Sequence, residues 1–229
     1  MSDDPLWQRT LAAADVAPDA RSDGAATEWE RWRGLLDSRV DWLRFVTEAR
    51  ATGLLERYPE LSATAGVPQS PTWHPEGDVL THLALSADAA TAACERDGVT
   101  GSDRYVAVLG ALAHDLGKAT TTRVRGGRIT SYGHADAGAE PARRLLDRIG
   151  APVEVRDRVI PVVIEHMTHM STPAGPTPRA VARLVRRLGA ASITDWARVV
   201  DADRAGRGAG ATSSPAAEWV AIAARMAPG

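Results

Sequence analysis

The run Val106–Lys118, VAVLGALAHDLGK, constrains the fold more than any other stretch of the sequence. Its apolar residues recur at spacings of three, four and three, which is typical of a helix with one face in a core: Val106, Leu109, Ala113 and Leu116. The run ends with adjacent His114 and Asp115, and Gly117 then predicts the end of the helix. A carboxylate beside an imidazole in a buried segment is unfavourable without a partner, and a divalent metal suits both. The alternative for an isolated His-Asp pair is a capped helix end with solvated side chains. The positions of the other histidines must show which of the two interpretations holds.

Charge and cysteine content limit the class of protein. The 229 residues include 27 basic and 29 acidic side chains, so the chain is not a polycation that binds nucleic acid without specificity, and any phosphate recognition must be local. The single cysteine, Cys94, excludes an internal disulfide. The N-terminus MSDDPLWQRT lacks the basic then apolar pattern of a signal peptide, and no apolar run approaches the roughly 20 residues that span a bilayer. We expect a cytoplasmic protein with no membrane partner.

Residues 1–66 are expected to form a helical N-terminal extension, and residues 67–229 the main domain. One apolar stripe covers positions i, i+3, i+6, i+7, i+11 and i+14 of the extension: Trp29, Trp32, Leu35, Leu36, Val40 and Leu43. We expect this stripe to pack in a core rather than to bind a ligand. Pro59, Pro68 and Pro71 then interrupt the helical pattern and predict a connecting segment.

Helical periodicity continues through most of the main domain. A helix is predicted over Val79–Ala93, with His82 beside its apolar side, and a Gly-containing turn over Asp97–Asp103. Around residues 120–130, Val124 and Ile129 flank a Gly-Gly pair, which predicts a short hairpin or flap. Three arginines of this flap could hold a phosphate together with Lys118: Arg123, Arg125 and Arg128. Routine surface charge is the alternative for each arginine.

The later histidines also fall on predicted helices. His134 opens one in which Pro141 either introduces a kink or marks the first turn, and His166 and His169 follow Val159 and Val163 on an apolar stripe that Pro161 should bend.

Three more helices are predicted near the C-terminus. Thr177-Pro178 starts the first, Thr194 is expected to cap the second, and a last packing helix follows Ser214-Pro215. The first should bury Val181, Leu184, Val185 and Leu188, and the last should pack through Trp219 and Met226.

Helical phase separates two acidic residues near the C-terminus. At about 100° per residue, Asp203 lies within about 20° of Trp196 and on the apolar face with Val199, whereas Asp201 lies about 140° away. An acid on an apolar stripe needs a cation. Asp203 is therefore the better candidate ligand.

The inward groups occur in the order His82, His114-Asp115, His134, His166 and Asp203. This order resembles the HD superfamily of metal-dependent phosphohydrolases. Five local segments in the region 67–207 look closely like the HD domain of bacterial CCA-adding tRNA nucleotidyltransferases and stand-alone relatives: WHPEGDVLTH, ALAHDLGKATT, YGHADAG, EHMTH and DADRAGR. The motifs of the nucleotidyltransferase half are absent from this sequence. An all-α helical bundle is the fold that the resemblance implies.

The resemblance also implies roles for the residues. His82, His114, Asp115 and Asp203 would ligate a first divalent ion. His134 and His166 would complete a second site with Asp115 as the bridge, or would instead contact the substrate phosphate as donors in a one-metal site; we expect two ions. Lys118 would stabilise charge on the phosphoryl group, with Asp115 and Lys118 as the catalytic pair. His74 and His169 are outer candidates for substrate contact or proton transfer.

Imidazole and carboxylate ligands in this mixture suit Mn, Ni, Co or Fe, with Mg less favoured. The expected reaction is hydrolysis of a phosphomonoester or phosphodiester in nucleotides or at RNA ends, such as 2',3'-cyclic phosphates and 2'- or 3'-phosphates. A free-nucleotide phosphatase of the 5'-nucleotidase kind is an alternative. A non-catalytic HD module that binds metal or nucleotide as a regulator is another, although the complete ligand set argues against it. The sequence specifies neither the base preference nor the oligomeric state.

Overall fold

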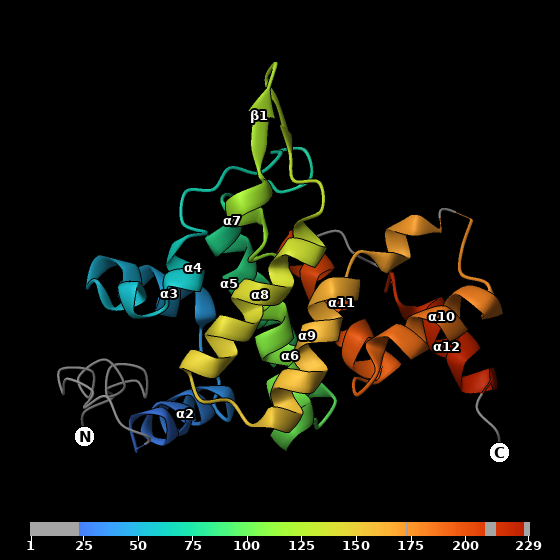
Figure 1. Ribbon diagram of the computed structural model, residues 1–229, viewed down its shortest axis with the longest axis horizontal. Coiled ribbons are helices and arrows are strands. Elements are labelled where there is room, and N and C mark those ends of the chain that lie inside the picture. Colours follow the sequence, from blue (N-terminus) through green and yellow to red (C-terminus); the bar gives the residue numbers. More distant parts are fainter. Residues whose placement is uncertain (1–22, 173, 209–213, 227–229) are drawn as a thin grey trace.

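The computed structural model describes residues 23–172, 174–208 and 214–226, and helices dominate these residues (Figure 1). In chain order the elements are α2 (Asp23–Leu36), α3 (Trp42–Ala51), η2 (Leu54–Arg57), α4 (Pro59–Ser62), α5 (Val79–Arg96), α6 (Gly101–Ala113), α7 (Lys118–Thr121), β1 (Arg123–Arg125), β2 (Arg128–Thr130), α8 (His134–Arg148), α9 (Val153–Glu165), η3 (Thr168–Ser171), α10 (Pro178–Leu188), α11 (Ile193–Gly206) and α12 (Ala217–Met226). The predicted all-α class is confirmed, and the two strands pair only with each other. No helix in the described ranges is both long and apolar enough to cross a bilayer.

Helix α6 lies at the centre and packs against α5, α9 and α11. Every residue from Val106 to Ala113 is buried, so neighbours surround the helix instead of covering one stripe. Gly110 permits the close approach of α11, because a Cβ at this position would lie 2.6 Å from Val199 Cγ2. The helix begins at Gly101, within the segment 97–103 that the sequence predicted as a turn.

The N-terminal helices share the main core. Trp32 of α2 stacks on Trp42 of α3 and meets Tyr58 edge to face. The predicted continuous stripe is wrong, because α2 ends at Leu36 and Asp41 caps a new helix by accepting a hydrogen bond from Arg44 N. Pro59 does not break a helix but occupies the first turn of α4. The division at residue 66 stays a prediction, and residues 1–22 lie outside the described part of the chain.

The hairpin of β1 and β2 projects from the helices (Figure 1). Val124 pairs with Ile129 in an antiparallel register, and Gly126 and Gly127 have φ values of 54° and 75°. Positive φ at both turn positions is the backbone that a two-residue I′ turn requires, so the Gly-Gly pair forms the predicted turn.

Helices α8 and α9 place the later histidines. Pro141 lies inside α8, well past its first turn. Helix α9 ends at Glu165, so the predicted stripe does not continue to His169, which lies on the separate 3-10 turn η3.

The C-terminal helices α10, α11 and α12 form a second apolar cluster around Trp196 and Trp219. Thr177 caps α10 as predicted. The cap of α11 is Ser192 and not Thr194, because Ser192 and Asp195 form a reciprocal capping box. Val185 and Met226 were expected to pack inward, but they are 45% and 44% exposed.

Candidate metal centre and cavity

Three helices contribute to a first triad of side chains. His82 comes from α5, His114 follows the last residue of α6, and Asp203 comes from α11. His82 Nε2 lies 3.2 Å from His114 Nε2 and 3.0 Å from Asp203 Oδ1. All three residues are buried.

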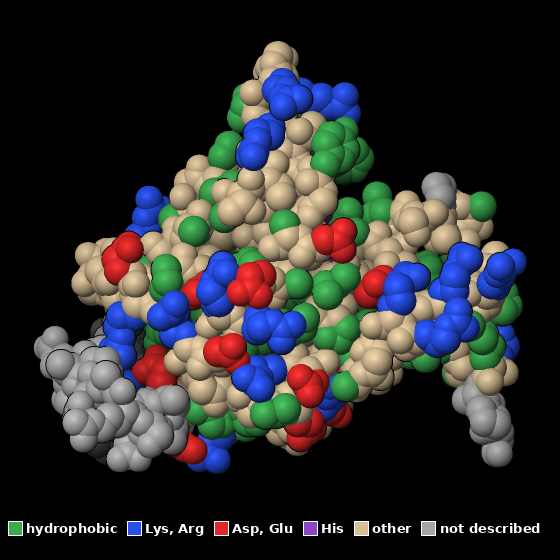
Figure 2. Space-filling model, in the orientation of Figure 1, with side chains coloured by type: hydrophobic (Ala, Val, Ile, Leu, Met, Phe, Trp, Pro, Cys, Tyr) green, Lys and Arg blue, Asp and Glu red, His purple; other side chains and the backbone are tan. Residues whose placement is uncertain are grey.

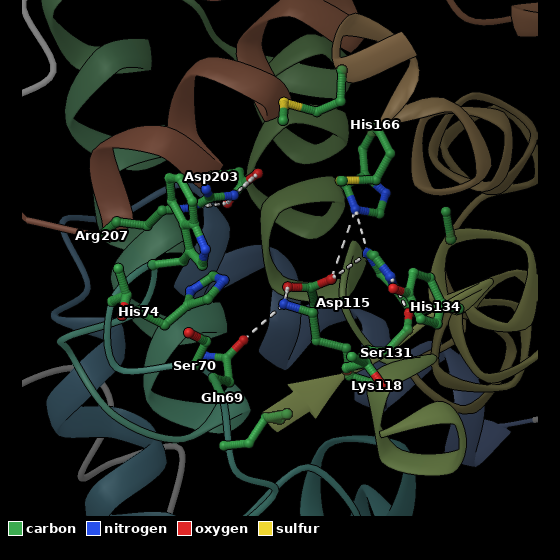
Figure 3. A pocket seen from close by; sticks show the side chains of 18 of the residues that line it. Gln69, Ser70, His74, Asp115, Lys118, Ser131, His134, His166, Asp203 and Arg207 are labelled. Carbon is green, nitrogen blue, oxygen red and sulfur yellow. Dashed lines mark hydrogen bonds and ion pairs between the residues drawn. The ribbon is translucent and has the colours of Figure 1, made fainter. Parts of the chain in front are cut away.

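A second triad lies on the other side of Asp115. Asp115 Oδ1 is 3.1 Å from His134 Nε2 at the start of α8 and 3.7 Å from His166 Nε2 at the end of α9. The two Nε2 atoms are 3.2 Å apart (Figure 3). Asp115 Oδ2 is 3.3 Å from His114 Nε2, so Asp115 gives one oxygen to each triad.

The other ring nitrogen of each of these histidines faces an acceptor. The partners are Ala111 O at 2.8 Å for His114, Ser131 O at 2.8 Å for His134, Val163 O at 2.7 Å for His166 and Glu76 Oε1 at 2.7 Å for His82. A carbonyl or carboxylate accepts a hydrogen bond from Nδ1–H, so in the neutral rings Nε2 carries the lone pair.

In its neutral form, each of these rings therefore turns the lone pair of Nε2 toward the other ligands of its triad. Two Nε2 atoms at 3.2 Å repel each other unless a positive charge lies between them. The buried Asp115 Oδ1 has no hydrogen-bond partner, although His134 Nε2 lies 3.1 Å away. This donor set fits divalent cations, and both triads could hold one.

The surrounding charges keep the carboxylates ionised. Burial would raise the pKa of Asp115, but Lys118 and His114 hold it well below its usual range. Burial is likewise outweighed at Asp203, where His82 and His114 lower the pKa. Burial lowers the pKa of His166 to about 3, so this ring is neutral at pH 7. The pKa of His82 is raised, because Asp203 and Glu76 outweigh burial; a proton and a metal ion compete for its Nε2.

Three residues that sequence reasoning missed support these groups. Glu76 accepts from His74 Nδ1 at 2.8 Å as well as facing His82, and its side chain is largely buried. Gln69 accepts a 2.7 Å hydrogen bond from Lys118 Nζ, and Arg207 donates to both oxygens of Asp203 at 2.7 and 2.8 Å. Glu76 stands in the quoted segment WHPEGD and Arg207 in DADRAGR, which was the only signal available.

Lys118, the only lysine in the sequence, is buried at 2.6 Å from Asp115 Oδ2. It lines a cavity of about 1220 Å³, together with Asp203 of the first triad and with His134 and His166 of the second (Figure 3). The candidate residues that line this cavity are His74, Asp115, Lys118, Arg128, His134, His166, His169 and Asp203. His82 and His114 lie beneath its surface.

Two predicted phosphate ligands do not line the cavity. Arg123 donates to the carbonyls of Thr120 and Thr122, and Arg125 is exposed on the hairpin. The sequence grouped these arginines with Lys118, but the projecting hairpin brings only Arg128 to the cavity wall. Asp201 is also outside it and accepts hydrogen bonds from Ser214 Oγ at 2.6 and 2.8 Å, as the helical phase predicted.

Gly117 has a different role from the predicted one. Helix α6 already ends at Ala113, and Gly117 has an ordinary φ of −65°, so it is not a left-handed terminator. A Cβ here would lie 2.0 Å from the His134 carbonyl oxygen and 2.6 Å from Gly138 N. Gly117 therefore allows the backbone after Asp115 to touch the start of α8, which carries His134.

Comparisons with known proteins agree with this geometry. Residues 79–204 match the HD domain. Proteins named Multifunctional CCA protein are 37% identical over 71% of this chain in Halorhodospira halophila, 35% over 76% in Laribacter hongkongensis and 32% over 97% in Burkholderia cenocepacia. The matched regions cover 36%, 41% and 53% of those proteins, so the chain spans about a third to a half of the relatives' length. From the domain match and these relatives, the chain belongs to the HD-domain family, a superfamily of metal-dependent phosphohydrolases.

Proposed function

We propose that this chain is a metal-dependent phosphohydrolase that cleaves phosphomonoesters or phosphodiesters at RNA ends or in nucleotides, including 2',3'-cyclic, 2'- and 3'-phosphates. The observation that carries the proposal is the pair of triads joined by Asp115 at the bottom of a large cavity. The resemblance of five segments to the HD domain of CCA-adding tRNA nucleotidyltransferases supports a substrate related to RNA.

The proposal gives each triad one divalent ion. The first ion would be held by His82, His114 and Asp203. The second would be held by His134 and His166. Asp115 would be a ligand of both ions. When bound, such ions supply a nucleophile at neutral pH and offset the charge of a phosphoryl oxygen. Manganese, nickel, cobalt or iron suit these ligands better than magnesium.

The remaining residues act directly on the substrate or on the ligands. Lys118 uses two of its three N–H donors on Gln69 and Asp115, so one is left for a phosphoryl oxygen in the cavity. Arg207 fixes the orientation of Asp203 through two hydrogen bonds. Burial lowers the pKa of His74 to about 4, so at pH 7 its ring is neutral and can accept a hydrogen bond from a substrate hydroxyl.

The decisive experiment is a hydrolysis screen of metal-reconstituted protein across 5'-nucleotides, 2',3'-cyclic nucleotides and RNA ends. His114→Ala and Asp115→Ala should abolish hydrolysis and metal retention. Asp201→Ala is the matched control and should keep both, because its side chain holds Ser214. Hydrolysis confined to 5'-nucleotides would favour a nucleotidase, and retained metal without any hydrolysis would favour a regulatory module.

His134 separates a two-metal from a one-metal site. His134→Ala should halve the metal content and reduce turnover steeply if the second triad holds an ion. If His134 instead contacts substrate, the metal content stays at one and only kcat and KM change. Elemental analysis beside steady-state kinetics distinguishes these results.

A further inference from the structure

Three large apolar or aromatic side chains that line the cavity are exposed and do not pack in the core. Trp73, Tyr132 and Met170 are 70%, 81% and 63% exposed, and all three line the cavity. Four other tryptophans, Trp32, Trp42, Trp196 and Trp219, are buried. Trp73 and Tyr132 come from two separate segments, the connection before α5 and the end of the hairpin. Two aromatic rings exposed on one cavity offer flat apolar faces that the rings of a ligand can cover.

The size of the cavity excludes a small phosphate ester as the full occupant. A volume of about 1220 Å³ exceeds the range of roughly 300–1,000 Å³ that holds a drug-sized molecule. A single nucleotide would therefore leave much of the cavity filled with water.

The charges in the cavity also exceed what one phosphate needs. Arg128 of the hairpin and Arg204 of α11 both line it and are exposed, and among the described residues no carboxylate forms an ion pair with either. Arg207 also lines the cavity, but its guanidinium already donates hydrogen bonds to Asp203. Figure 2 shows further arginine side chains on the projecting hairpin. On the cavity wall itself, positive charge beyond the triads comes from Arg128 and Arg204.

We propose that the cavity takes the end of a single-stranded oligonucleotide, at least two nucleotides long, with its bases stacked on Trp73 and Tyr132. The terminal phosphate lies at the triads and Lys118, and the next phosphates lie near Arg128 and Arg204. Aromatic platforms beside a basic groove bind single strands in this way, because every base offers a π face. The inference rests on the proposed function and narrows its substrate class from nucleotides in general to strand ends.

Kinetics test the stacking directly. Trp73→Ala and Tyr132→Ala should each raise KM about 5- to 150-fold for a tetranucleotide with a terminal phosphate, because one base–aromatic stack is lost. Tyr132→Phe should stay near wild type. Hydrolysis of glycerol 2-phosphate should change less than about twofold, since this ester has no ring to stack. Val124→Ala, on the same hairpin, exposed and outside the cavity, is the control.

Binding tests the inference without hydrolysis. In chelator, a tetranucleotide should quench tryptophan fluorescence and bind at least tenfold more tightly than a mononucleotide, and Trp73→Phe should lose most of the quenching. Ribo- and deoxyribonucleotide versions show whether the 2'-hydroxyl contributes. Equal affinity for both lengths, or a tetranucleotide KM unchanged in both alanine variants, overturns the inference. If both alanine variants leave the tetranucleotide KM unchanged but the protein still hydrolyses phosphate esters, the stacking inference fails and the proposed function stands. If the tetranucleotide binds in a Trp73-dependent way but no substrate is hydrolysed, the proposed function fails and the binding site stands.

Discussion

Gly117→Ala should damage the second triad and spare the first. The new Cβ would meet backbone atoms, the His134 carbonyl oxygen at 2.0 Å and Gly138 N at 2.6 Å, so no side chain can rotate away. Ordinary contact begins at 3.4 Å, and the backbone must therefore move by about 1.4 Å. Because His134 is the first residue of α8, that movement carries its ring away from Asp115.

The expected loss of stability and of metal follows from how much displacement the core and the metal ligands each tolerate. Overpacking of a well-packed core costs about 1–3 kcal/mol, which leaves a domain of ordinary stability folded. Metal–ligand distances tolerate only about 0.2 Å, far less than the required shift. We expect the melting temperature to fall by about 2–12 °C and the metal content to fall from two ions per chain to one. His82, His114 and Asp203 come from other helices and should keep their ion.

The assay is elemental analysis after dialysis against Mn²⁺, paired with thermal unfolding. Gly34→Ala is the matched control, because nothing lies within 4 Å of a Cβ at that position of α2, and it should be neutral or stabilising. A Gly117→Ala protein with both ions and an unchanged melting temperature would refute the reasoning.

Three further predictions concern the ligands and the protons. Glu76→Gln should weaken metal binding about 10- to 100-fold at the first triad only, measured by calorimetric titration, because Glu76 orients His82. In metal-free protein, stability should fall as pH decreases below 6.5, because the unfolded chain then binds a proton that buried His166, with its pKa of about 3, refuses. At pH 5 this residue alone should lower the free energy of unfolding by about 2 kcal/mol. In urea unfolding, the His166→Gln variant should not show this contribution to the pH dependence. Removing metal with a chelator should lower the melting temperature, and Mn²⁺ at about 100 times its Kd should restore about 2.7 kcal/mol.

Helical periodicity predicted the residues whose positions depend on local backbone geometry. Asp203 turns inward and Asp201 outward because a helix advances by a fixed angle per residue, whatever packs around it. The same rule failed where two helices meet, since Val40 and Leu43 continue the phase of Trp29 although α2 ends at Leu36. Asp41 was the available signal for that break, as Ser192 with Asp195 was for α11.

Contacts between distant segments could not be predicted. Gln69 reaches Lys118 across 49 positions, and Gly117 matters only because α8 returns to it. No periodicity encodes such an approach. The histidines and acids expected at the site do converge, and their roles as ligands stay predictions for the metal measurements.

The division of Asp115 between the two triads makes their occupancies interdependent. The first triad has a carboxylate of its own in Asp203, whereas the second relies on Asp115 alone. The first ion should therefore load at the Asp203 side and withdraw electron density from the shared carboxylate. Loading of the second ion then occurs with lower affinity, and by thermodynamic reciprocity the second ion weakens the first by the same factor. A titration should show two unequal steps, and free metal concentration would then set the fraction of dinuclear centres.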